Sequence, residues 1–69
     1  MKYIIRIKPG KEKLAAKFCC MALRKGQVYV RHTSSRDTYT ASKRLATRFD
    51  TKDEAEQEAM EYEMAILAK

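Results

Sequence analysis

Alternation of apolar and polar side chains over residues 2–8 constrains the fold of this chain more than any other feature. One side of the pattern holds Tyr3, Ile5 and Ile7, and the other holds Lys2, Ile4, Arg6 and Lys8. A period of two residues is typical of a half-buried β-strand. Pro9 and Gly10 then end the strand, because proline cannot donate a ladder hydrogen bond and glycine gives the turn its conformational freedom. The sequence therefore predicts a sheet that begins at the second residue.

Residues 11–25 have two readings. The stretch is rich in Ala, Leu, Lys and Met, and its larger apolar residues follow helical spacing up to Gly26, so it predicts a helix. The alternative is a hairpin through Lys25 and Gly26, in which residues 18–23 pair with the following strand. Periodicity alone does not separate these readings, because the run FCCMAL is continuously apolar.

The middle of the chain predicts further strands. Residues 27–33 alternate and are β-branched and aromatic, which indicates a second strand. Residues 34–42 are dominated by small hydroxyl side chains and are typical of a turn or long hairpin loop, with residues 37–40 partly extended as an option. Residues 45–49 are interpreted as a short third strand.

Thr51 and Glu54 have the spacing of a capping box, in which each side chain satisfies a backbone donor of the first helical turn. A C-terminal helix is therefore predicted to begin at Thr51. Its apolar stripe comprises Ala55, Ala59, Met60, Tyr62, Met64, Ile66 and Leu67. The predicted fold class is α+β: a small antiparallel sheet of about three strands packed against this C-terminal helix, with an extra helix after the first strand.

Length and charge indicate a single domain that binds rather than catalyses. With 69 residues the chain has room for one domain, residues 1–69, and one modest core. Residues 1–49 carry thirteen Lys or Arg against two acidic residues, a net charge of +11, whereas residues 50–69 carry two Lys against seven acidic residues, a net charge of −5. A basic field of that size favours nucleic acid, either DNA or RNA, or an acidic protein surface.

Several chemistries find no support in the sequence. Cys19 and Cys20 are adjacent, so they do not suit a disulfide and are interpreted as free thiols in a reducing cytoplasm. A zinc site needs about four Cys or His ligands at set spacing, which His32 and the adjacent cysteines do not supply. The two glycines do not form a phosphate loop. We therefore expect no catalytic residues, no metal and no cofactor. No run of about 18 apolar residues suggests a membrane span.

The strongest functional feature is a stretch rich in hydrogen-bond donors from Arg31 to Arg44, with Arg48 shortly after it. Arginine offers a planar fork for phosphate, hydroxyl groups offer short donors, and a tyrosine can stack on an exposed base. The predicted nucleic-acid contacts are Arg31, Arg36, Tyr39, Lys43, Arg44 and Arg48. A solubilising polar hairpin explains the same stretch equally well. If the helix predicted after the first strand covers the sheet face that carries Arg6, Tyr29 and Arg31, that face is lost as a binding surface.

Two resemblances bear on function. The opening residues KYIIR and the segment ATRFDTKDEA at residues 46–55 resemble small phage and prophage accessory proteins, in which a few strands lead through an A-x-R-F-x-T-x-x-E-A segment into a final helix. That resemblance implies a small accessory protein, in the host cytoplasm if it is phage-encoded, and carries over no site residues; the expectation of nucleic-acid binding comes from the charge of residues 1–49.

The order of three strands and a helix is also similar to the arm-type DNA-binding domains of phage integrases, whose three-stranded sheet reads the major groove. By that resemblance the contacts would be Tyr29, Arg31, Arg36, Lys43, Arg44 and Arg48. The apolar segment at residues 14–23 departs from that plan. The alternative hypothesis is a protein that modulates an acidic host factor, with homodimerisation as an option.

Overall fold

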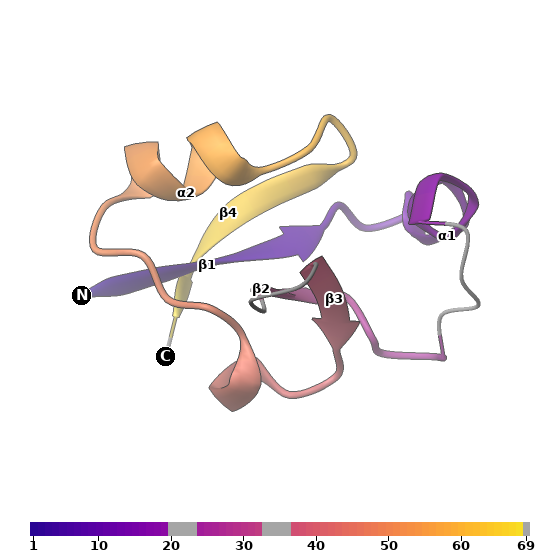
Figure 1. Cartoon of the computed structure of the whole chain (residues 1–69), viewed down its shortest axis with the longest axis horizontal. Coiled ribbons are helices and arrows are strands. Elements are labelled where there is room, and N and C mark those ends of the chain that lie inside the picture. The colour runs from indigo at the N-terminus through magenta and orange to yellow at the C-terminus, as the bar shows by residue number, and fades with distance from the viewer. Residues whose placement is uncertain (20–23, 33–36, 69) are drawn as a thin grey trace.

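The computed structural model describes residues 1–19, 24–32 and 37–68, and within them four strands form one antiparallel sheet in the order β3-β2-β1-β4. Figure 1 shows α2 on one side of this sheet, η1 on the opposite side, and α1 beyond one end of β1. The elements in chain order are β1 (Lys2–Ile7), α1 (Glu12–Cys19), β2 (Tyr29–His32), β3 (Asp37–Thr40), the 3-10 helix η1 (Lys43–Leu45), α2 (Lys52–Glu58) and β4 (Glu63–Ala68).

The core lies on the face of the sheet that carries Ile5 and Ile7. Both side chains are fully buried. Ile5 clusters with Val30 and with Ala55 of α2, and Ile7 clusters with Ala15 of α1. Both helices therefore pack on the same side of the sheet, which we call the helix face. The predicted first strand and its alternation are confirmed.

Of the helix predicted over residues 11–25, residues 12–19 are helical, whereas Arg24 and Lys25 are not. α1 begins two residues after Gly10, whose φ of +85° suits a glycine. The hairpin alternative is wrong for Phe18 and Cys19, because both belong to α1. Residues 20–23, the remainder of that alternative strand, lie outside the described part of the chain. So do Cys20 and the side chain of Cys19, on which the free-thiol interpretation depends.

The prediction that residues 45–49 form the third strand is wrong. β3 comprises residues 37–40 and pairs with β2 along its whole length, from Tyr29 opposite Thr40 to His32 opposite Asp37. Phe49 instead makes an isolated antiparallel bridge to Tyr3. The Thr47 N–H donates to Val30 O at 3.1 Å. Residues 47–49 thus hydrogen-bond to β2 through Thr47 and to β1 through Phe49, and they form an isolated bridge in place of a third strand.

The C-terminal helix is shorter than predicted. Thr51 caps α2 as expected, its Oγ1 accepting the Glu54 N–H at 3.2 Å. The helix ends at Glu58, however, and Ala59 has extended backbone angles. Residues 63–68, predicted to be helical, form β4 and pair with β1 over six positions, from Lys2 opposite Ala68 to Ile7 opposite Glu63. The apolar spacing of this segment fits a helix or a strand, and pairing with β1, which is distant in sequence, makes it a strand.

Candidate nucleic-acid interface

The face of the sheet opposite α1 and α2 carries most of the predicted cationic contacts. Residues directly opposite each other in an antiparallel ladder share a face. Arg6 lies opposite Tyr29, Tyr29 opposite Thr40, and Arg31 opposite Thr38. These five residues, together with Lys43 and Arg44 of η1 and with Arg48, form what we call the basic face.

Tyr29 lies at the centre of this face and is half-buried. The Arg6 Cζ and the Lys43 Nζ each lie 5.9 Å from the centroid of its ring. Such cation–π contacts hold a positive charge close to an aromatic surface. The Arg6 Nε also donates to the backbone oxygen of Ile7 at 2.8 Å, which holds the guanidinium over the ring. Two cations from different elements thus meet at one tyrosine.

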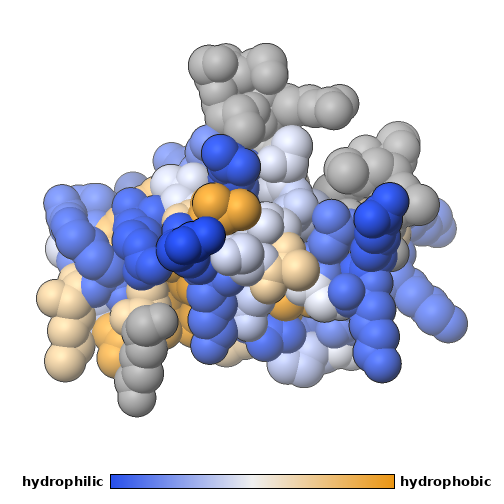
Figure 2. Space-filling view, turned by 90° about the horizontal axis from the view of Figure 1, so that it is seen from below, coloured by the Kyte–Doolittle hydropathy of each residue, from blue (hydrophilic) through white to orange (hydrophobic). Residues whose placement is uncertain are grey.

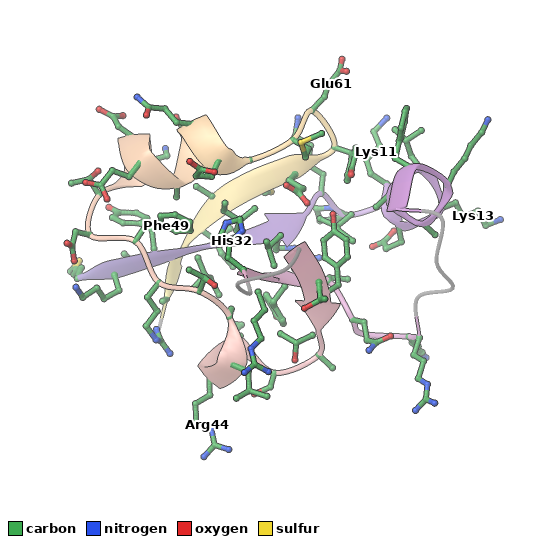
Figure 3. All side chains as sticks on the ribbon, viewed as in Figure 1. Lys11, Lys13, His32, Arg44, Phe49 and Glu61 are labelled. Atoms are coloured by element: carbon green, nitrogen blue, oxygen red, sulfur yellow. The ribbon has the colours of Figure 1, made fainter. Side chains whose placement is uncertain are left out.

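The short helix η1 brings Lys43 and Arg44 to the basic face. Ser42 precedes it with extended backbone angles, and the Leu45 N–H donates to the Ser42 oxygen at 3.1 Å, which closes the turn. Both basic side chains are exposed. Figure 3 shows Arg44 pointing away from the body of the protein, on the side opposite α2. Its guanidinium is therefore accessible to a ligand that approaches the basic face.

Arg48 reaches the same side by alternation. Phe49 packs in the cluster around Ile5 on the helix face, and its ring lies edge-on to His32 with centroids 5.8 Å apart. Neighbouring side chains of an extended segment point in opposite directions. Arg48 is exposed and so belongs to the basic face, at its border with β1.

Two of the six predicted contacts are not brought together with the others. Tyr39 lies opposite Val30 on the helix face, and its hydroxyl donates to the carboxylate of buried Glu63. It therefore belongs to the interior, which corrects the prediction that it stacks on a base. Arg36 lies outside the described residues. Arg31, Lys43, Arg44 and Arg48 share the basic face.

Arg6 and Tyr29 are functional candidates that the set of six omitted. Alternation of residues 2–8 placed Arg6 opposite the apolar side of its strand, and the same pattern in residues 27–33 separated Tyr29 from Val30. What the sequence lacked was the register: only the pairing of Arg6 with Tyr29 shows that the two side chains are neighbours.

Charge is divided between the two sides of the molecule. Viewed from the side of η1, the surface is mostly hydrophilic, with smaller apolar patches (Figure 2). On this face of the β1–β4 pair, Ile4 is fully buried and lies opposite Ile66, and exposed Met64 lies opposite Arg6. On the other side, α2 exposes Asp53, Glu54, Glu56 and Glu58. Most of the described cations form two groups: one lies around α1 (Lys8, Lys11, Lys13, Lys17, Arg24 and Lys25), and the other lies on the basic face (Arg6, Arg31, Lys43, Arg44 and Arg48).

At the edge of the basic face, Lys2 forms an ion pair with Asp50. The hydrogen bond from the Lys2 ammonium and its charge hold the pKa of Asp50 below its usual value. Lys2 is therefore already partnered within the chain, in contrast to the cations grouped around the ring of Tyr29.

The described residues contain no group of three or more His, Cys, Asp or Glu side chains arranged to hold a metal ion. A search of the same residues finds no helix with the length and apolar character needed to cross a membrane. No protein-family model matches the chain, and searches of curated proteins and of solved structures find no match either.

Proposed function

We propose that this chain is a small phage-like accessory protein that binds nucleic acid through the basic face. The observation that carries the proposal is the meeting of Arg6 and Lys43 at Tyr29, with Arg31 on the same face. These cations come from three separate elements, and a hairpin that only increases solubility would not require that convergence. Phosphate groups are the ligands that such a cluster of fixed cations suits.

The distribution of charge supports the same conclusion. The exposed acidic side chains of α2 lie on the other side of the sheet from η1 (Figure 1), so they do not oppose an anion that approaches the basic face. A polarised molecule of this kind orients itself toward a polyanion during the encounter, and salt weakens that attraction. The phage-like assignment is supported by the resemblance of residues 46–55.

The test is a fluorescence-anisotropy titration with labelled single-stranded and duplex DNA and RNA at several salt concentrations. The Arg31→Ala/Lys43→Ala variant removes two cations from the basic face. The matched control, Lys11→Ala/Lys13→Ala, removes the same charge at α1, far from Arg44 (Figure 3). We expect the first variant alone to weaken binding, and its slope of log K against log salt to fall in magnitude by about 1.4 for a single strand or 1.8 for a duplex.

Equal losses of affinity in both variants would contradict the proposal, because they would show that nucleic acid is attracted by the net charge of the chain and not by a specific site. Absence of salt-dependent binding in the unmodified chain would also contradict it.

A second candidate function is binding of another protein, through the surface around Met60 and Met64. These side chains are 55% and 37% exposed and line one depression together with Ala59 and Ala65. Methionine is common on surfaces that adapt to a partner. Light scattering coupled to size exclusion tests the self-associating version: a dimer that Met60→Ser/Met64→Ser dissociates would support it, and a monomer at all concentrations would exclude it.

A further inference from the structure

We infer that the basic face binds single-stranded nucleic acid and that Tyr29 stacks on one of its bases. This inference rests on the proposed function and adds the class of ligand. The ring of Tyr29 is only half-buried, although it stands in the interior of the sheet, where β1 and β3 flank β2. A tyrosine at such a position presents a flat aromatic surface that the ladder on either side holds in place.

The surroundings of the ring match what a nucleotide requires. Arg6 and Lys43 lie at equal distances of 5.9 Å from the ring centroid, so a base that contacts Tyr29 has cations close to its own phosphates. The hydrogen bond from the Arg6 Nε to the backbone oxygen of Ile7 restricts the orientation of the guanidinium and leaves its two terminal nitrogens to donate to a phosphate. Arg31 follows Tyr29 by two residues and lies on the same face, about 7 Å along the strand.

The partly exposed ring of Tyr29 favours a single strand over a duplex. In a duplex each base is stacked between its neighbours, and a protein reaches only phosphates, sugars and the edges of bases. A tyrosine ring therefore gains no stacking from a regular duplex. In a single strand the bases are free to stack on aromatic side chains, and sheets with exposed aromatic residues among cations bind RNA and DNA in this way.

Tyr29 of β2 and Tyr39 of β3 lie on opposite faces of the sheet. Tyr39 is on the helix face, where it packs in the core and its hydroxyl donates to Glu63. Tyr29 is on the basic face and contacts two cations. Similar rings on adjacent strands thus serve the interior in one case and, by this inference, a ligand in the other.

The test compares Tyr29→Leu with Tyr29→Phe on single strands of about twelve nucleotides, both oligo-dT and oligo-U, and on a duplex of the same length. We expect Tyr29→Leu to weaken single-strand binding about 10- to 100-fold and Tyr29→Phe to preserve it, because stacking needs the ring and not the hydroxyl. Duplex binding should be nearly the same in both variants. The thermal midpoints of the two variants show whether each remains folded.

An oligonucleotide with abasic sites separates stacking from a structural effect, since it keeps the phosphates and lacks the bases. The unmodified chain should bind it more weakly than oligo-dT, whereas Tyr29→Leu should bind both equally. If Tyr29→Leu weakens binding to the abasic strand as much as to oligo-dT, or if it changes neither, base stacking on Tyr29 is excluded.

The proposed function would survive that result, provided that binding still required Arg31 and Lys43. If the duplex is bound more tightly than either single strand, this inference also fails while the proposed function stands. If no nucleic acid is bound, both fail.

Discussion

The two faces of the sheet are made by the same strands and differ in charge. On the helix face, Ile5 and Ile7 are fully buried against α1 and α2. On the basic face, the next residue along, Arg6, lies over a half-buried tyrosine, although Ile4 of the same face is fully buried as well. Period-two alternation thus places a stabilising surface and a candidate binding surface on one strand. We therefore expect mutations of the buried isoleucines to affect stability and mutations of the cations on the basic face to affect binding.

The largest expected effect is on the helix face. Ile5→Ala should lower the free energy of unfolding by about 2–5 kcal/mol, because it leaves a cavity between the sheet and α2. Arg31→Ala on the basic face should change stability by less than about 0.5 kcal/mol. Urea denaturation measures both, and Ile5→Val, with a loss of about 0.5–1.5 kcal/mol, serves if the alanine variant does not fold. Equal losses from Ile5→Ala and Arg31→Ala would contradict the division of roles.

Glu63 should give the next largest effect. It is the buried charged residue of the helix face, 6% exposed, and its carboxylate accepts the Tyr39 hydroxyl and the Met60 N–H, the latter at 2.7 Å. Glu63→Ala leaves both donors without this acceptor and should cost about 1–3 kcal/mol.

A double-mutant cycle with Tyr39→Phe isolates the bond between the two side chains, which joins the opposite edge strands β3 and β4. Strictly additive losses would show that the two residues act independently.

A smaller effect is expected at the start of α2. Thr51→Ala removes the acceptor of the Glu54 N–H and should lower stability by about 1 kcal/mol, whereas Thr51→Ser keeps the hydroxyl and most of that stability. Thermal denaturation followed by circular dichroism measures the difference. Nucleic-acid binding should be unchanged, since α2 lies on the other side of the sheet; a weaker complex with the alanine variant would break the separation of the faces.

The smallest effect concerns the ion pair between Lys2 and Asp50, whose side chains are 54% and 72% exposed. The pKa of Asp50 is lower in the folded state than its usual value. Its contribution to stability is therefore complete above the unfolded pKa of an aspartate, about 3.9, and is lost as the pH falls through the lower folded value. Asp50→Asn should be slightly less stable than the unmodified chain at pH 6, and the difference should shrink as the pH falls below about 3.9. A difference that does not shrink would show another cause.

The parts of the fold that depend on neighbouring residues in the chain could be predicted from the sequence. The alternation of residues 2–8 gave β1, and the Thr51–Glu54 spacing gave the start of α2. The end of α2 was missed because residues 59–67 have apolar spacing that suits a helix or a strand, and only the pairing with β1 separates them.

The candidate site was predictable to a similar extent. Arg31, Lys43, Arg44 and Arg48 were identified from the density of donors in the chain, and the structure places them on one side of the sheet. Tyr39 was included among the contacts because the face on which it lies depends on the register of β3 against β2, which the sequence did not show. The same missing register hid the pairing of Arg6 with Tyr29.

An NMR titration of the ¹⁵N-labelled chain with a single-stranded oligonucleotide, followed through its backbone amide signals, would locate the binding site directly. We expect the largest shifts on β2, β3 and η1, with Tyr29 and Lys43 among them, and little change on α1 and α2. Shifts concentrated on α1 or α2, or spread evenly over all lysine-bearing segments, would contradict the claim that the basic face is the binding site.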